Sequence, residues 1–241
     1  MEKNSGWTTG GLIGAGVAVG LIFLGCMFYT GVSQYLGQTR VVTVKGLAER
    51  EVPADQVIWP ITFKETGDNL LTTHTKVEAD SQKVVAFLKK SGLEDSEFSF
   101  GAPEIQDRNA EGMDMRGPRY TLTGSITVNS TKVDQVRRLM AAQKELIGEG
   151  VPVTTDKWNT VFLYTKLNTV KPAMVEEATK NAREVAQKFA ADSGSHIGKI
   201  KSANQGQFSI TDANQSTPYE KKVRVVTTVT YFPERTDHLI G

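Results

Sequence analysis

The sequence is poor in the residues that build metal centres and covalent cross-links. Its 241 residues include one cysteine and three histidines. The single thiol, Cys26, excludes an internal disulfide framework and any zinc site made of several cysteines. His74, His196 and His238 lie far apart along the chain and show no recognisable metal-ligand spacing. We therefore expect neither a metal nor a cofactor.

An excess of either charge is also missing. The chain has 28 Lys and Arg residues against 27 Asp and Glu residues, which gives a net charge of +1. This balance argues against nucleic acid as a partner, because phosphate-binding surfaces need a local excess of positive charge. A hydrophobic content of 39% with 23% charged residues is sufficient for a folded core.

Recognisable catalytic motifs are absent from the sequence. There is no Gly-x-Ser-x-Gly motif, and the adjacent Ser195 and His196 cannot adopt the geometry of a catalytic triad. The neighbouring Glu176 and Glu177 are better explained by interaction with a helix N-terminus than by paired acid catalysis. We expect no catalytic residues and a protein that is not an enzyme.

The N-terminal part of the chain contains a long apolar run. Charged residues are absent from Asn4 to Thr39, and Gly11–Tyr29 is almost wholly apolar or glycine. As a helix this run would reach about 28 Å, close to the thickness of a bilayer hydrocarbon core. Trp7 precedes it, and Tyr29 and Tyr35 suit the headgroup zones at its other end. The sequence predicts a tail and transmembrane anchor over 1–39, with the lipid bilayer as partner.

Two processing events compete with a permanent anchor. One is a cleaved signal peptide whose apolar core is Leu12–Leu24, although no small-x-small cleavage site follows before a polar stretch. The other is acylation of Cys26, for which Gly25 fits the preceding position but Phe23 and Leu24 fit poorly. We expect an uncleaved single-pass anchor, and lipidation of Cys26 stays open.

Small residues recur along one side of the apolar run at spacings of three and four. The stripe consists of Gly11, Gly14, Ala18, Leu21 and Gly25. Small residues on one helix face let a second helix approach closely in the membrane, so the stripe predicts helix association. Glycine is also common in membrane helices generally, so composition alone is the alternative explanation.

The remainder, residues 40–241, alternates between strand-like and helix-like patterns. Strands are expected at 41–50, 56–63, 97–107, 120–128, 155–166, 197–205 and 223–232, and helices at 70–91, 133–147 and 170–193. Hairpins and helices mix without strict βαβ alternation. The sequence therefore predicts one α+β domain with antiparallel or mixed sheets and helices packed on one face.

Individual residues refine this picture. Pro60 lacks an N–H, so its strand should be an edge or carry a bulge. Asp68 or Asn69 should cap the first helix, and the spacing of Thr131 and Asp134 predicts a capping box for the second. The apolar stripe of the third helix is expected to be Val175, Ala178, Ala182, Val185 and Phe189. One strand face should carry Trp158, Phe162 and Tyr164.

Two polar segments and two sequons complete the features of the domain. Residues 107–119 are expected to form a mobile hairpin tip, and 206–220 a polar loop. Asn129-Ser-Thr131 and Asn214-Gln-Ser216 match the N-glycosylation pattern, which can also arise by chance.

The segment Val41–Asp55, with the sequence VVTVKGLAEREVPAD, resembles the opening strand and turn of SIMPL-domain proteins. These are often described as oxidative-stress-defence or periplasmic immunogenic proteins. The segment Glu177–Ala190, with Gly194 and Gly198 after it, is similar to the long alanine-rich helix of that family and the strand that follows. The positions that match are Gly46, Pro53, Asp55, Ala182, Ala186 and Gly198.

This resemblance spans about residues 40–233 and implies an exported domain without agreed catalytic residues. Some similar proteins assemble into ring- or channel-like oligomers. The leading hypothesis is therefore a non-enzymatic envelope protein that self-associates into a ring or cage, linked to envelope or oxidative stress. It would be anchored in the inner membrane with its domain in the periplasm or outside. The alternative is a monomeric binding module that presents loops 107–119 and 206–220 to an unknown small-molecule ligand or a partner.

Overall fold

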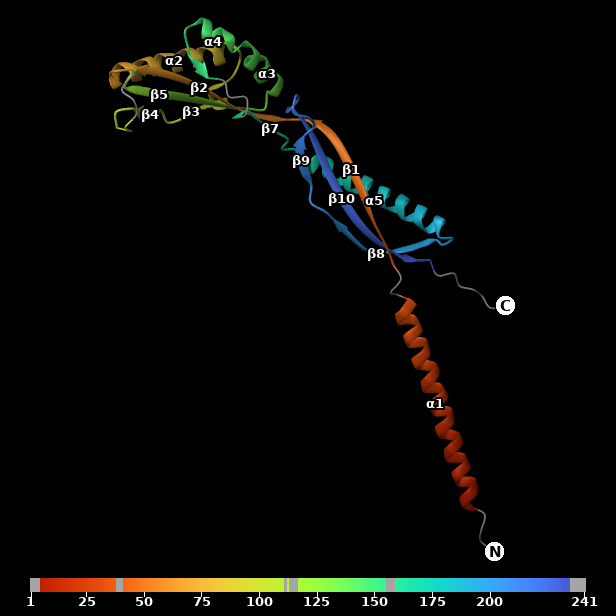
Figure 1. The fold of residues 1–241 in the computed structure, drawn as a ribbon. Coiled ribbons are helices and arrows are strands. Elements are labelled where there is room, and N and C mark those ends of the chain that lie inside the picture. Colours follow the sequence, from red (N-terminus) through yellow and green to blue (C-terminus); the bar gives the residue numbers. More distant parts are fainter. Residues whose placement is uncertain (1–4, 38–40, 111, 113–116, 155–158, 235–241) are drawn as a thin grey trace. The chain divides into compact units, whose positions relative to one another are not determined.

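The structure is a computed structural model that describes residues 5–37, 41–110, 112, 117–154 and 159–234. It begins with a single helix, α1 (Ser5–Gly37), seen in Figure 1. The side chains of α1 are described for Gly14–Val32. By their contacts the residues form two compact units. Unit 1 comprises Met1–Ala48, Val175–Gln207 and Val225–Gly241, and unit 2 comprises Glu49–Met174 and Phe208–Arg224. This grouping concerns compactness alone, so the expected domain boundary at residue 40 stays a prediction.

Unit 1 is built on a sheet with the strand order β1-β10-β8, to which β9 adds by pairing with β10. The strands are β1 (Val42–Pro53), β8 (Ile197–Gln205), β9 (Ser209–Asp212) and β10 (Glu220–Pro233), and β9 itself belongs to unit 2. Helix α5 (Leu167–Asp192) runs beside this sheet (Figure 1), and its Ala182 and Ala186 contribute to the core. The buried cluster of unit 1 is Val44, Ala182, Ala186, Val229 and Tyr231.

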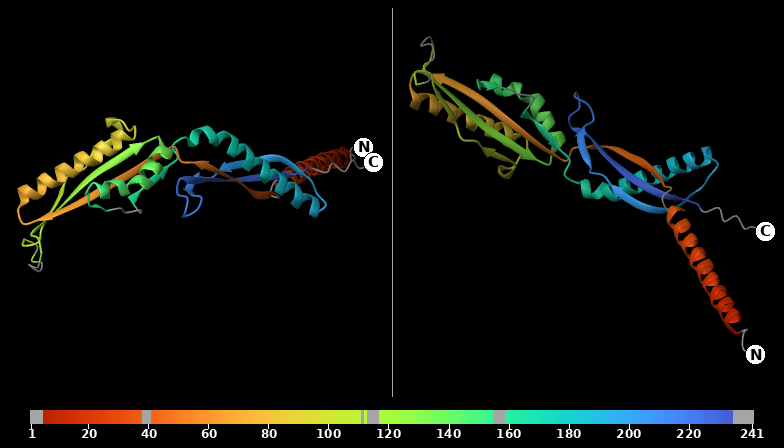
Figure 2. Two further views of the ribbon diagram at one scale, coloured as in Figure 1. Left: turned by 90° about the horizontal axis from the view of Figure 1, so that it is seen from above. Right: turned by 60° about the horizontal axis from the view of Figure 1, so that its bottom comes forward.

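Unit 2 has a larger antiparallel sheet with the strand order β3-β5-β2-β6, and β4 and β7 pair with β5 and β2. The strands are β2 (Gln56–Gly67), β3 (Phe98–Phe100), β4 (Glu104–Asp107), β5 (Tyr120–Ser130), β6 (Val153–Thr154) and β7 (Val161–Leu163). The helices are α2 (Leu70–Lys90), α3 (Val133–Ala142) and α4 (Lys144–Gly148), with the short 3-10 helix η1 (Asp95–Glu97). Figure 2 shows these helices from two further directions.

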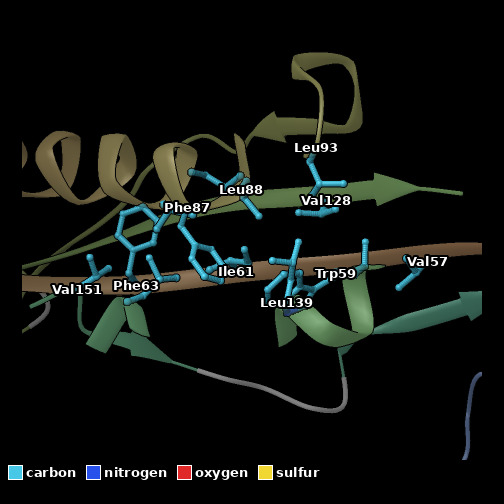
Figure 3. Packing of buried hydrophobic residues seen from close by; sticks show 14 of the residues in the cluster. Val57, Trp59, Ile61, Phe63, Phe87, Leu88, Leu93, Val128, Leu139 and Val151 are labelled. Atoms are coloured by element: carbon cyan, nitrogen blue, oxygen red, sulfur yellow. The ribbon is translucent and has the colours of Figure 1, made fainter. Parts of the chain in front are cut away.

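The core of unit 2 lies between one face of this sheet and the helices. Burial alternates residue by residue along β2 and β5, as expected for strands with one covered face. Trp59, Ile61 and Phe63 of β2 point into the core, where Leu88 of α2 and Leu139 of α3 meet them (Figure 3). The predicted α+β class, with antiparallel sheets and an apolar N-terminal helix, is confirmed.

Two expected elements are interrupted. The strand expected at 97–107 is divided into β3 and β4, because Pro103 has no N–H for a sheet. The helix expected at 133–147 breaks at Gln143, which separates α3 from α4.

The strand expected at 155–166 is also only partly present. It is represented by β7, in which Phe162 is buried, and Tyr164 follows the end of that strand. Trp158 lies outside the described residues.

Pro60 does not make β2 an edge strand, and the pairing with β5 continues through it without a bulge. On the other side, β7 pairs with 56–58 and β6 with 62–63, so no described pairing reaches Pro60 there. The Lys64 N–H donates to the Pro152 carbonyl on that side. The N–H groups of every second residue point to the same side of a strand, so the Pro60 nitrogen faces the space between β6 and β7. The proline is accommodated by an interruption of the neighbouring strand.

The apolar stripe of α5 differs from the expected one. Its most buried positions in unit 1 are alanines at intervals of four: Ala178, Ala182, Ala186 and Ala190. Val185 and Phe189, which were expected in the stripe, are 37% and 60% exposed, and Val175 is half-buried. Apolarity alone favoured the larger side chains, whereas the close approach of β1 selects the smaller ones.

The capping predictions have mixed outcomes. Asn69 caps α2, and its side chain accepts a hydrogen bond from the Thr72 N–H at 3.2 Å. The capping box of Thr131 and Asp134 is wrong, because the N-cap of α3 is Lys132 without a side-chain cap. The Ser130 hydroxyl accepts the Lys132 N–H instead, at 3.0 Å.

The two polar segments also differ from each other. Residues 107–119 connect β4 to β5 as expected for a hairpin, and their mobility stays a prediction. The segment 206–220 is not one open loop, because β9 lies within it and pairs with β10.

Candidate functional site

The apolar helix α1 is the first candidate. Gly14–Val32 has a mean hydropathy of 1.9, and its side chains are exposed throughout, including Leu21 at 65% and Phe23 at 73%. Its length and composition suffice to cross a bilayer, and a signal sequence would have the same properties. Because so much contiguous apolar surface is unfavourable in water, the helix needs a lipid or protein surrounding.

The small-residue stripe is open where the structure describes it. Gly14, Ala18, Leu21 and Gly25 are all exposed, and a Cβ added at Gly14 or Gly25 would meet no atom within 4 Å. Gly11 belongs to the part of α1 whose side chains are not described. The small residues Gly14, Ala18 and Gly25 leave space beside Leu21 for a second backbone, and helix association stays a prediction.

The aromatic residues and the thiol of α1 can be placed only in part. Tyr29 is 75% exposed, while the side chains of Trp7 and Tyr35 lie outside the described residues. Cys26 is a free, exposed thiol in the same helix.

The family-motif positions of unit 1 lie where backbone segments approach closely. A Cβ on Gly46 of β1 would stand 2.5 Å from the Ala182 nitrogen of α5. Beside this junction, the Asn181 side chain donates to the Leu47 carbonyl at 2.7 Å. A Cβ on Gly198 would stand 3.1 Å from the carbonyl oxygens of Phe232 and Pro233. These positions fix the distance of α5 and β8 from their neighbours.

Asp55 organises the start of α5 from within unit 2. Its carboxylate accepts hydrogen bonds from the Thr165 N–H at 2.8 Å, the Thr165 hydroxyl at 3.1 Å and the Lys166 N–H at 3.2 Å. Pro53 ends β1 just before it. Backbone N–H groups near a helix N-terminus have no acceptor within the helix, and the Asp55 carboxylate supplies one here.

A polar cluster fastens the β4–β5 hairpin. Arg119 donates from Nε and Nη2 to the two carboxylate oxygens of Asp107, at 3.1 and 2.9 Å. These hydrogen bonds lower the pKa of the Asp107 carboxyl from its usual value. The Arg119 N–H also donates to Asp68, at 3.1 Å. The cluster therefore ties this hairpin to the turn that precedes α2.

A surface hollow of about 560 Å³ lies next to this cluster. Its lining combines polar and exposed apolar side chains: Asp68, Asn69, Leu70, Leu71, His74, Ile105 and Tyr120. Leu71 is 75% exposed and Ile105 51% exposed. His74 faces Glu78 at 3.9 Å, and among the described residues no three metal-binding side chains converge.

The segment after β9 is fastened to unit 2 by Tyr219. The Arg137 guanidinium stacks over its ring at 3.4 Å, and the Ala54 N–H donates to its carbonyl at 2.8 Å. Phe162 packs edge-to-face against the same ring. This cluster was not predicted, because no local sequence pattern connects four residues as far apart along the chain as Ala54, Arg137, Phe162 and Tyr219.

Comparison with known families gives one result. The sequence model of SIMPL, described as a protein of unknown function (DUF541), matches residues 42–231. The chain belongs to the SIMPL family. No curated protein matches it.

The family match confirms the resemblance seen in the strand and helix patterns, and it starts after the apolar helix. Each of the positions Gly46, Asp55 and Gly198 has a structural explanation in close packing or capping. In this SIMPL chain the motif therefore describes how the domain is built.

Proposed function

We propose that this SIMPL protein is a non-enzymatic, membrane-anchored envelope protein whose domain self-associates into a ring or cage. The anchor would be α1, and the contacts would form at the exposed sheet edges of unit 1. Its biological role would be linked to envelope or oxidative stress, as the family resemblance implies.

The main support is the exposed edge of β1 in unit 1. The strand order β1-β10-β8 leaves one side of β1 without a neighbouring strand among the described residues. Asn181 lies on the side of α5 next to β1, because its side chain donates to the Leu47 carbonyl. Val185 and Phe189 follow Asn181 at intervals of four residues, so they lie on the same side of the helix. Both side chains are exposed, so apolar surface borders an open strand edge. Such an edge favours the addition of another strand.

The opposite edge offers a complementary strand. Residues 199–205 of β8 are all exposed, and Ile200 is 50% exposed. Lysines at an edge usually oppose strand addition, but Lys201 lies over the Phe232 ring at 5.4 Å. Pairing β1 of one copy with β8 of the next would be a head-to-tail contact, and such contacts close into rings when the rotation permits.

Anchoring in a membrane would strengthen this association. Copies held in one bilayer have a high effective concentration, so weak edge contacts can act together. The small-residue stripe of α1 would add contacts within the membrane.

The decisive measurement is the mass of the detergent-extracted, full-length protein. We expect a large defined oligomer that Phe189→Glu dissociates, because a charge would stand beside the β1 edge. Ile147→Glu is the matched control, since Ile147 is equally exposed, at 62%, but lies on α4 of unit 2. A monomer for the unmodified protein, or equal dissociation by both variants, would contradict the proposal.

The second candidate is a monomeric binding module, and the hollow beside the β4–β5 hairpin favours it. Leu71 and Ile105 give that hollow apolar walls, while Asp68 and His74 give it polar groups. A clean monomer that binds a ligand, with binding lost in Leu71→Asp, would support this function over self-association.

We further propose that the N-terminus lies in the cytoplasm and residues 40–241 outside it. Arg40, Lys45 and Arg50 would favour the opposite topology by the positive-inside rule, but so small a charge difference is a weak determinant. Protease added to intact spheroplasts should cleave the β4–β5 hairpin. Full protection until the membrane is permeabilised would place the domain in the cytoplasm.

A further inference from the structure

One of the two sequons lies in an exposed turn after β9. The Asn214 side-chain oxygen accepts hydrogen bonds from the Ser216 N–H at 3.0 Å, the Ser216 hydroxyl at 2.7 Å and the Thr217 N–H at 2.8 Å. Its side-chain nitrogen has no hydrogen-bond partner among the described residues. Asn214 and Ser216 are both exposed. The sequon hydroxyl thus contacts the amide, and the nitrogen that would be modified stays free.

The second sequon has a different environment. Asn129 lies inside β5, where it pairs with Ile58 of β2, and its side-chain oxygen accepts from the Gln56 side chain at 2.6 Å. The structure gives no contact between Asn129 and the Thr131 hydroxyl. A transferase would have to detach this segment from the sheet before it could bind the sequon.

From this contrast we propose that Asn214 is the acceptor of an N-linked oligosaccharide and that Asn129 is not. The donor would be an oligosaccharide joined to a lipid pyrophosphate. In the transfer, a bond forms between Asn214 Nδ2 and C1 of the first sugar, and the bond from C1 to the pyrophosphate oxygen breaks. The lipid pyrophosphate leaves with the electron pair, and the amide proton passes to a base of the transferase.

The turn geometry suits this reaction. Hydrogen bonds to the amide oxygen polarise the amide and make its N–H more acidic, which favours loss of the proton as the new bond forms. The glycan would extend into solvent, where N-linked sugars are found on surface loops. In a cell, modification rests on the topology proposed above, because the lipid-linked donor is used on the non-cytoplasmic side.

The test is an in vitro transfer reaction, which does not depend on topology. Full-length, detergent-solubilised protein is incubated with a lipid-pyrophosphate oligosaccharide and a purified single-subunit oligosaccharyltransferase that accepts Asn-x-Ser/Thr. Intact mass and glycopeptide mapping give the rate at each sequon. Tryptic peptides that contain Asn129 or Asn214 serve as unfolded controls and show that the transferase accepts both sequences.

We expect one glycan on the folded chain, at Asn214, with an initial rate about tenfold or more above that at Asn129 because the strand must open first. Asn214→Gln and Ser216→Ala should abolish it, Ser216→Thr should retain it, and Asn129→Gln should leave it unchanged. Equal modification of both sequons in the folded chain would overturn the proposal. So would absence of transfer to folded Asn214 when its peptide is modified, whatever the oligomeric state or topology.

Discussion

Gly46 of β1 lies so close to Ala182 of α5 that no side chain fits between the two backbones. A Cβ on Gly46 would stand 2.5 Å from the Ala182 nitrogen and 2.8 Å from the Ala182 Cβ. It would also collide with the Ala178 carbonyl oxygen. The small size of the α5 alanines and of Gly46 in β1 therefore meets a single packing requirement, which gives a physical reason for the positions that the sequence resemblance matches.

Gly46→Ala should therefore destabilise unit 1. The added methyl group meets backbone atoms, which move only if the helix shifts, so we expect a loss of about 2–3 kcal/mol in the free energy of unfolding. The measurement is urea unfolding in detergent, followed by circular dichroism. Gly148→Ala is the control, because a Cβ there would meet no atom within 4 Å, and its unfolding midpoint should change little. Equal stability of Gly46→Ala and the unmodified protein would show that α5 is not held this closely.

Asp55→Ala should weaken the connection from β7 into α5. Three donors from Thr165 and Lys166 would lose their acceptor, so we expect about 1–2 kcal/mol of destabilisation. Asp55→Asn keeps one acceptor oxygen and should cost less. Asp95→Ala removes a carboxylate that is 73% exposed and paired with Lys89, and it should change stability by less than about 0.5 kcal/mol. If both alanine variants unfold at the same urea concentration, the role assigned to Asp55 is wrong.

Local sequence patterns were sufficient to predict many elements of the fold. The alternation in β5 and the Asn69 cap of α2 depend on neighbouring residues, and both are found where the sequence indicates. The apolar helix α1 follows from composition alone. Such elements are predictable because their physical causes lie within a few residues.

Other features depend on distant residues. The burial of Ala186 rather than Val185 follows from the closeness of β1, which no window on α5 contains. The interruption opposite Pro60 involves β6 and β7. The stacking of Arg137 on Tyr219 joins α3 to the turn before β10. The anchor could be predicted because it depends on local composition alone. The hollow beside His74 could not, because it exists only once the β4–β5 hairpin has folded against the start of α2.

Glu97 should make unit 2 sensitive to acid. Partial burial acts to raise its pKa, but hydrogen bonds from the Lys132 ammonium, the Ser130 hydroxyl and the Glu94 N–H prevail and lower the pKa to about 2. Since the folded-state pKa lies below the unfolded-state value near 4.5, the stabilisation is fully present above pH 4.5. It is lost as the pH falls from 4.5 towards 2.

Glu97→Gln should accordingly flatten the pH dependence of stability in that window. We expect the variant to be less stable than the unmodified protein by about 1–2 kcal/mol at pH 7, with the difference shrinking towards pH 2. Urea unfolding at a series of pH values measures this directly. Glu104→Gln, at an exposed position of β4, is the control. An equal difference at pH 7 and near pH 2 would show that ionisation of Glu97 does not carry the effect.

Removal of residues 1–39 should release a folded domain from the membrane. The family match begins at residue 42, and none of the described side chains of α1 is buried, so the deleted segment contributes none of the buried core described for either unit. We expect the truncated protein in the soluble fraction, with a circular dichroism spectrum that retains the strand signal and a diminished helix signal. Attachment that survives a high-salt wash would require a second membrane contact, because charge-based binding to lipid headgroups is screened by salt. The matched control is the full-length protein, which should stay in the membrane fraction under the same wash and leave it only in detergent.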